Sequence, residues 1–331
     1  MNTNFSLYVG TSTGILKGVR IEKYENGIKA IPKNLVTNRE DISNKNEIKC
    51  LNWNNDLYEE ILIGMKKKVQ IYNTKNEQFT ENIDLPLGEC CGIFKENEAL
   101  FVGSTSGVVY SIQMPIKEKK QFEMFKLNKP IDCMKKSSIH PNIIGTGGKN
   151  NDLKLWDINT HQMTFIAKNI KPDELQLPIP IWVSDLIFLR SSEKIATCMR
   201  HGYVRLYDPL LPQRRPVFNA FQQDKVFTCI CDTPNDNQFL VGSGSGDMFL
   251  VDIRGRIPFA GKYKGFCGSI KNIICPPTQN LIFSVSLDRH FRIHNFKTRK
   301  LLFKDYMFSR LTTLLCKEPS STNNISSNLL L

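Results

Sequence analysis

The sequence of 331 residues predicts an all-β fold, a seven-bladed β-propeller, on two observations. Seven segments repeat one order: an apolar strand, a turn of small or charged residues, and an alternating strand that ends in a polar residue. Their turns recur at intervals of 40 to 53 residues, about 46 on average. This interval is close to the ~40–45 residues of one WD-repeat blade. We therefore expect a propeller of the WD-repeat type.

The seven hairpins differ in how clearly the sequence marks them. Residues 100–112, 143–158, 195–208 and 239–253 are clear, whereas 8–20, 61–73 and 282–295 are weaker. Glycine, asparagine or a long polar residue suits a tight turn between antiparallel strands, where a positive φ is often needed. The residues expected at the turns are Gly14, Lys67, Gly107, Asn151, Gly202, Gly246 and Arg289.

Each hairpin needs an inner strand before it and an outer strand after it. Inner strands are expected at 48–53, 90–94, 131–134, 182–189, 226–231 and 270–275, which leaves the first hairpin without one. A surplus strand at 310–316 follows the last blade, and we expect it to complete the first blade and close the ring. Closure removes the exposed sheet edges that promote aggregation. The predicted domains are one propeller over 1–318 and a disordered Ser/Asn-rich tail over 319–331.

A two-sheet sandwich is the alternative fold, but a sandwich has no reason to repeat at a fixed interval. The repeats are degenerate, because only Trp156-Asp157 keeps the Trp-Asp pair. The buried hydrogen-bond set of regular WD blades can therefore be present only in part.

Composition excludes several classes of protein. The longest apolar runs fall far short of the ~20 residues needed to cross a bilayer, so no membrane association is expected. Ten cysteines occur without any C-x-x-C spacing, so we expect reduced, buried thiols and no metal site. The glycine clusters at 145–149 and 242–246 lack phosphate-loop spacing and are interpreted as hairpin turns.

No nucleophilic or metalloprotease motif occurs, so neither an enzyme nor a cofactor or small-molecule substrate is expected. The densest titratable cluster is Asp288-Arg289-His290 with Arg292 and His294. We interpret it as the turn and third strand of the last blade. A hydrolase remains a third option, whose sign would be carboxylates or a metal in the channel.

The chain carries 44 Lys and Arg against 32 Asp and Glu, a net charge of +12. The propeller divides these charges between two faces. The turn face holds the turns between second and third strands and the loops that enter inner strands. The loop face holds the other loops. On the turn face we expect Lys66, Lys67, Lys68, Lys149, Arg200, His201, Arg289 and His290. On the loop face we expect Lys117, Lys119, Lys120, Lys135, Lys136, Arg214, Arg215, Arg254, Arg256, Lys297, Arg299 and Lys300. An arc of cations on a rigid ring suits a phosphate backbone or an acidic protein surface.

Two proline-rich loops stand out. Arg214 and Arg215 lie among Pro209, Pro212 and Pro216, which stiffen the loop and hold the guanidinium groups out at low entropic cost. The other loop, 168–185, contains three further prolines, with Asp173 and Glu174 at its tip. Trp182 is either a core residue or an exposed anchor, and its place at the start of an inner strand favours the core.

At these loops the sequence resembles a known family. The runs KNIKPDELQLPIPIWVSDLIFL, YVRLYDP-x-x-PQRRPV and SLDRHFRIH are similar to nucleolar WD-repeat proteins of large-ribosomal-subunit assembly. That family is called WD repeat-containing protein seventy-four in animals and Nop-seven-associated protein one in fungi. The resemblance implies a seven-bladed propeller without enzymatic activity, which joins nucleolar precursors of the large subunit and is released by an AAA-type ATPase. The family pattern falls on Lys168, Asn169, Pro180, Trp182, Asp185, Arg205, Asp208, Arg214, Arg215, Pro216, Asp288 and Arg289.

This resemblance implies a docking platform in pre-60S particles, located in the nucleus and nucleolus and supporting rRNA processing. Its partners would be pre-60S assembly factors, pre-rRNA and the AAA-type ATPase, and it would be a monomer outside the particle. Residues 318–331 lack the lysine-rich tail of many relatives, which leaves the nuclear import route open. Residues expected to bind partners or RNA are Arg214, Arg215, Lys168, Asp173, Glu174, Trp182, Asp185, Arg200, His201, Arg254, Arg256 and Arg289. The alternative is an adaptor of a ubiquitin ligase or chromatin complex, which the W-D-x-R-like run at 251–254 favours.

Overall fold

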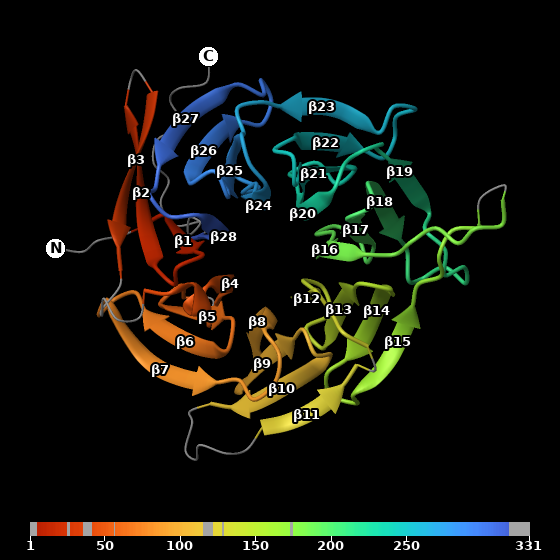
Figure 1. Cartoon of the computed structure of the whole chain (residues 1–331), viewed down its shortest axis with the longest axis horizontal. Coiled ribbons are helices and arrows are strands. Elements are labelled where there is room, and N and C mark those ends of the chain that lie inside the picture. Colours follow the sequence, from red (N-terminus) through yellow and green to blue (C-terminus); the bar gives the residue numbers. More distant parts are fainter. Residues whose placement is uncertain are drawn as a thin grey trace.

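A computed structural model describes residues 5–24, 27–35, 42–55, 57–114, 122–127, 129–172 and 175–317. In these ranges the chain forms seven four-stranded antiparallel sheets, arranged in a ring around a central channel (Figure 1). Each sheet is one blade, with one strand at the channel and another at the outer edge. The predicted seven-bladed propeller is therefore confirmed. The expected tail at 319–331 lies outside the described residues.

Blades are numbered in chain order, and the strands of each blade are named from the channel outward. Blade 1 contains β28 (Leu311–Cys316), β1 (Leu7–Thr11), β2 (Leu16–Tyr24) and β3 (Gly27–Asn34). The short 3-10 helix η2 (Asn44–Asn46) leads into blade 2, with β4 (Ile48–Trp53), β5 (Glu60–Met65), β6 (Lys68–Asn73) and β7 (Gln78–Asp84). Blade 3 contains β8 (Cys90–Glu96), β9 (Ala99–Ser104), β10 (Val108–Gln113) and β11 (Phe122–Lys126).

The remaining blades follow the same order. Blade 4 contains β12 (Cys133–Lys136), β13 (Ile143–Gly148), β14 (Asn151–Asp157) and β15 (Gln162–Ile166). Blade 5 contains β16 (Val183–Phe188), β17 (Ile195–Met199), β18 (Tyr203–Tyr207) and β19 (Phe218–Phe221). Blade 6 contains β20 (Phe227–Asp232), β21 (Gln238–Ser243), β22 (Met248–Asp252) and β23 (Phe259–Tyr263). Blade 7 contains β24 (Ile270–Ile274), β25 (Leu281–Ser286), β26 (His290–Asn295) and β27 (Leu301–Tyr306).

The ring closes where the surplus strand was expected to close it. β28 pairs antiparallel with β1, in a register that sets Tyr8 opposite Leu315 and Val9 opposite Leu314. The inner edge of β1 is thereby hydrogen-bonded, so blade 1 has the same four strands as its neighbours.

The hydrophobic core is divided among the interfaces between blades. Seven clusters of buried residues occur in the described part of the chain, and each joins two neighbouring blades. The cluster between blades 7 and 1, for example, packs Val9 and Leu314 against Phe283 and Phe291. Alternating strands produce this arrangement because each sheet buries both of its faces against the neighbouring blades.

At most positions, the hairpin turns have the backbone conformation that the sequence predicts. Gly14, Gly107, Gly202, Gly246 and Arg289 have positive φ, as expected for tight turns. In blade 4 the positive φ falls on Asn150 rather than on Asn151, and Lys67 is not among the residues with positive φ.

The hydrogen-bond set of regular WD blades is present in part, as predicted. In blade 4, Trp156 donates from Nε1 to Oγ1 of Thr146 across 3.0 Å, and both side chains are buried. Blade 5 instead buries Arg205, whose Nη1 lies 3.7 Å from Oδ2 of Asp152 in blade 4. Blade 7 buries Arg292 beside Asp288 of its own turn.

Candidate interaction surfaces

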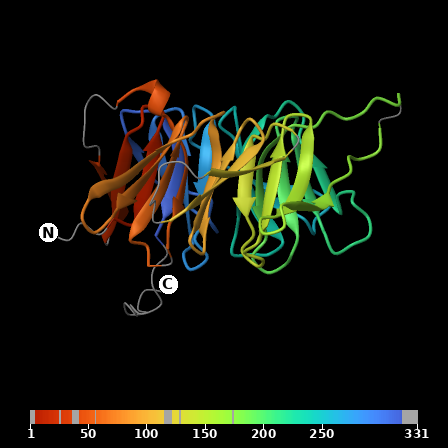
Figure 2. The ribbon, with the colours of Figure 1, turned by 90° about the horizontal axis from the view of Figure 1, so that it is seen from below.

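The two proline-rich loops meet at the outer rim of the propeller. Residues 167–182 join β15 of blade 4 to β16 of blade 5, and residues 208–217 join β18 to β19 within blade 5. The amide of Lys168 donates a hydrogen bond to the carbonyl of Arg214 across 2.8 Å. We call the segments 168–172, 175–180 and 208–217 the double-loop surface. Figure 2 shows the first of these loops projecting beyond the disc of blades.

Internal hydrogen bonds hold each loop in shape. The side-chain amide of Asn169 donates to the carbonyl of Ile179 across 2.7 Å, which closes the base of the first loop. In the second loop, a carboxylate oxygen of Asp208 accepts from the amide of Leu210 at 3.1 Å, an Asx turn. The amide of Val217 returns the chain to blade 5 by donating to the carbonyl of Leu206.

The double-loop surface carries exposed cations and exposed apolar side chains. Lys168, Arg214 and Arg215 are exposed, and Leu175 and Leu210 are 79% and 72% exposed. Arginine is enriched at protein–protein interfaces, to which apolar side chains also contribute. The predicted residues Asp173 and Glu174 lie outside the described residues.

Trp182 does not lie in the core, contrary to expectation. It is half-buried, and its indole nitrogen donates to a carboxylate oxygen of Asp132 across 2.6 Å. The Lys149 ammonium lies 4.9 Å and the Arg200 guanidinium 4.6 Å from the ring centroid, and the His201 ring centroid is 6.3 Å away. Trp182 thus forms a cation–π cluster on the turn face with the predicted residues Arg200 and His201.

Asp185 lies in the wall of the central channel, away from the double-loop surface. Its carboxylate accepts from the amides of Leu186 at 2.9 Å and of Ile230 at 3.2 Å, which links blades 5 and 6. Burial raises the pKa of Asp185, although Lys135, with its Nζ 3.9 Å from Oδ1, opposes this rise. The geometry gives Asp185 a role inside the ring.

The cations expected on the loop face are partly neutralised. Arg254 makes a two-point contact with Asp252, with Nε–Oδ1 at 3.0 Å and Nη2–Oδ2 at 2.8 Å. Hydrogen bonds from Arg254 and from Gln238 hold the pKa of Asp252 well below its usual value. Lys136 pairs with Glu96. Arg256 is exposed, and Lys117, Lys119 and Lys120 lie outside the described residues.

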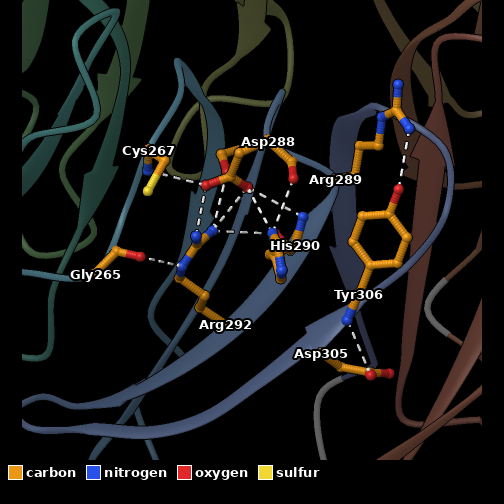
Figure 3. Close-up of polar contacts among 9 residues, drawn as sticks. Gly265, Cys267, Asp288, Arg289, His290, Arg292, Asp305 and Tyr306 are labelled. Carbon is orange, nitrogen blue, oxygen red and sulfur yellow. Dashed lines mark hydrogen bonds and ion pairs between the residues drawn. The ribbon is translucent and has the colours of Figure 1, made fainter.

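The turn of blade 7 is a structural hydrogen-bond cluster around Asp288 (Figure 3). Its carboxylate accepts from Arg292, from the Ser286 hydroxyl and from the amide of Cys267 at 3.0 Å. Although burial opposes ionisation, the hydrogen bonds from Arg292 and Ser286 hold the pKa of Asp288 well below its usual value. Arg289 points away from this cluster and donates to the hydroxyl of Tyr306 at 3.0 Å.

The central channel contains a cavity of about 390 Å³ lined by the inner strands. Its charged groups include Lys135 with Asp185 and Arg190 with Asp232, which form ion pairs. Within the described ranges, no group of three or more His, Cys, Asp or Glu residues is placed to hold a metal ion. Those same ranges contain no helix long and apolar enough to cross a membrane.

The fold and these surfaces define a WD-repeat propeller with loops that extend from the rim of a ring of blades. No family model matches the chain. WD repeat-containing protein 74 of Bos taurus is 32% identical over 97% of this chain and 86% of its own length. The Homo sapiens protein of the same name is 32% identical over 93% of this chain and 80% of its own length. Ribosome biogenesis protein NSA1 of Meyerozyma guilliermondii is 26% identical over 68% of this chain and 66% of its own length.

The chain belongs to the family of WD repeat-containing protein 74, since identity above 30% extends over nearly all of it.

Proposed function

We propose that the protein is a ribosome biogenesis factor, a non-catalytic scaffold that docks in nucleolar precursors of the large ribosomal subunit and supports rRNA processing. The similarity to proteins named for ribosome biogenesis supports the general role. Its partners would be pre-60S assembly factors and pre-rRNA, with release by an AAA-type ATPase. The protein would act in the nucleus and nucleolus.

The observation that carries the docking role is the hydrogen bond between the Lys168 amide and the Arg214 carbonyl. It joins the loop between blades 4 and 5 to a loop within blade 5, in one surface that carries both cations and exposed leucines. Because main-chain atoms form this contact, the side chains of Lys168, Arg214 and Arg215 are available for a partner. Guanidinium groups on a stiff loop bind carboxylates or phosphates with little loss of entropy.

The experiment is co-sedimentation of the full chain with large-subunit precursors on a sucrose gradient. The variant with Arg214→Glu and Arg215→Glu should fold normally but leave the precursor fractions. A matched control with Lys126→Glu and Lys304→Glu makes the same change in charge on the exposed outer strands β11 and β27. The control should co-sediment like the wild type, and unchanged co-sedimentation of the Arg214/Arg215 variant would refute the docking role.

A further inference from the structure

A cleft of about 600 Å³ opens on the turn face between blades 7, 1 and 2. The turns of blades 7, 1 and 2 meet there with the segments that enter β28 and β4 and with Lys271 of β24. Its lining includes the charged side chains of Glu47, Lys66, Lys271, Arg289 and Arg310 and the ring of Phe308. It lies apart from the double-loop surface, which is at the rim of blades 4 and 5.

Positive charge dominates this cleft. Lys66, Lys271, Arg289 and Arg310 line it together with one carboxylate, that of Glu47. The Glu47 carboxylate is already shared, because Nζ of Lys66 lies 3.1 Å and Nζ of Lys49 lies 3.3 Å from Oε2. Its charge therefore does not balance the other cations. A bound anion would be stabilised by this excess.

Lys271 is the innermost of these cations, since it also lines the central channel. No carboxylate of the described residues lies within ion-pair distance of its ammonium group. Burial lowers the pKa of Lys271, the nearby charges of Arg200 and Lys49 lower it further, and the charge of Glu47 opposes this fall only in part. An anion in the cleft would relieve this repulsion.

An aromatic side chain stands beside the cations. Phe308 is 78% exposed, and its ring packs edge-on against Tyr306 with centroids 5.3 Å apart. The hydroxyl of Tyr306 accepts from Arg289 (Figure 3), so the aromatic pair and the guanidinium group are held together. An exposed ring next to Arg and Lys is the arrangement with which proteins stack bases and contact phosphates of single-stranded nucleic acid.

The backbone fixes these groups in place. Arg289 has φ 68° and Phe308 has φ 63°, a left-handed conformation that is uncommon for such residues. Main-chain hydrogen bonds tie these segments to their neighbours: the amide of Met307 donates to the carbonyl of Arg289 at 2.8 Å, and the amide of Ser12 donates to the carbonyl of Arg310 at 2.9 Å.

From these observations we propose that the cleft binds single-stranded RNA, with one base stacked on Phe308 and adjacent phosphates held by Arg289, Arg310 and Lys271. An acidic peptide would use the cations but would have no need of an exposed phenylalanine ring. RNA uses both, and the hydroxyls of Ser12 and Ser309 are further donors for phosphate or ribose oxygens. The assignment rests on the proposed function because it assumes that the protein works among RNA.

The test is the binding of a fluorescein-labelled 12-nucleotide oligouridylate to the purified full chain, measured by fluorescence anisotropy at several salt concentrations. Phe308→Gly keeps the left-handed backbone and removes the ring, and it should weaken binding about tenfold, as expected for one lost stacked base. Arg289→Gly with Arg310→Gln removes two phosphate contacts. This variant should reduce the slope of log K against log salt by roughly 1.4.

A matched control keeps the change in charge away from the cleft. The variant with Lys126→Glu and Lys304→Glu, whose substitutions lie on outer strands outside the lining of the cleft, should keep wild-type affinity for the oligonucleotide. Thermal unfolding of every variant checks that the fold is intact. The proposal is overturned if the wild type does not bind the oligonucleotide, or if Phe308→Gly binds it unchanged. It is also overturned if a labelled oligoglutamate peptide binds and RNA does not. None of these outcomes changes the co-sedimentation result for Arg214 and Arg215.

Discussion

Val9 of β1 and Leu314 of β28 lie opposite each other in the sheet of blade 1, and both are buried. Their pairing joins the first and last strands of the propeller, so blade 1 is assembled from two distant parts of the chain. The stability of the whole ring therefore depends on one strand-to-strand contact. Other blades have no such dependence, because their strands are consecutive.

Removal of β28 should prevent folding. A chain that ends at residue 310 lacks the strand that pairs with β1 and leaves blade 1 with an open inner edge. We expect aggregation and the loss of cooperative thermal unfolding. Leu314→Ala, a milder change, should lower the free energy of unfolding by about 2–5 kcal/mol. A chain that ends at residue 319 is the control and should melt like the wild type. Wild-type melting of the chain that ends at 310 would contradict the closure.

Loss of Asp288 should destabilise blade 7 strongly. Asp288→Ala leaves the fully buried guanidinium of Arg292 without its counter-charge, which typically costs about 3–5 kcal/mol. Denaturant unfolding measures this loss. The double variant Asp288→Ala with Arg292→Met removes both charges and should recover much of the stability. If Asp288→Ala alone were neutral, the ion pair would have no structural role.

His294 should make stability depend on pH. Nε2 of its buried ring lies 2.9 Å from the carbonyl of Lys264, so Nε2 carries the proton, and the buried Nδ1 has no hydrogen-bond partner among the described residues. Burial lowers the pKa of His294 below its ordinary value, and the Arg292 charge contributes to this shift. The unfolded chain binds a proton at pH values where the folded protein does not. Stability from this residue is therefore present above the unfolded pKa of about 6.5 and is lost as pH falls below it.

The measurement is the free energy of unfolding at pH 7.5 and at pH 5.5. The wild type should lose stability between the two values. His294→Gln can still donate to the Lys264 carbonyl but does not titrate, so it should lose less. An equal loss in both proteins would assign the pH dependence to other groups.

Asn169 should control the order of the first loop without affecting the blades. Asn169→Ala removes the hydrogen bond to the Ile179 carbonyl that closes the base of the loop. We expect faster cleavage by a protease between residues 170 and 180, with the melting temperature nearly unchanged because the loop lies outside the core. Asn280→Ala, an exposed position between β24 and β25, is the control and should not change the cleavage rate. Unchanged cleavage of Asn169→Ala would show that the loop is ordered by other contacts.

The fold was largely predictable because strand alternation and turn residues are local properties of the sequence. The inner strand predicted at 48–53 coincides with β4, and the closing strand predicted at 310–316 differs from β28 by one residue. Closure could also be predicted, because six inner strands for seven hairpins left one blade incomplete. The sequence predicted the turn at Asn151, but Asn150 has the positive φ. Because two asparagines are adjacent there, the sequence does not distinguish between them.

The surfaces were less predictable because they depend on contacts between distant segments. The Lys168–Arg214 hydrogen bond joins main-chain atoms, which leave no signature in side-chain patterns. Trp182 was expected in the core from its place beside an apolar strand, but cations from two turns and Asp132 hold it at the face. The cleft beside Phe308 was missed, although the predicted closure brings residues 308–310 next to the turn of blade 1.

The main-chain character of the Lys168–Arg214 contact has an evolutionary consequence. The spacing between the two loops is set by the amide of residue 168 and the carbonyl of residue 214. Every amino acid supplies the carbonyl, and every amino acid except proline supplies the amide. The side chains there can change under selection for a new partner while the gap between the loops stays constant. Such a rim can exchange one binding specificity for another in single mutational steps, without loss of its shape along the way.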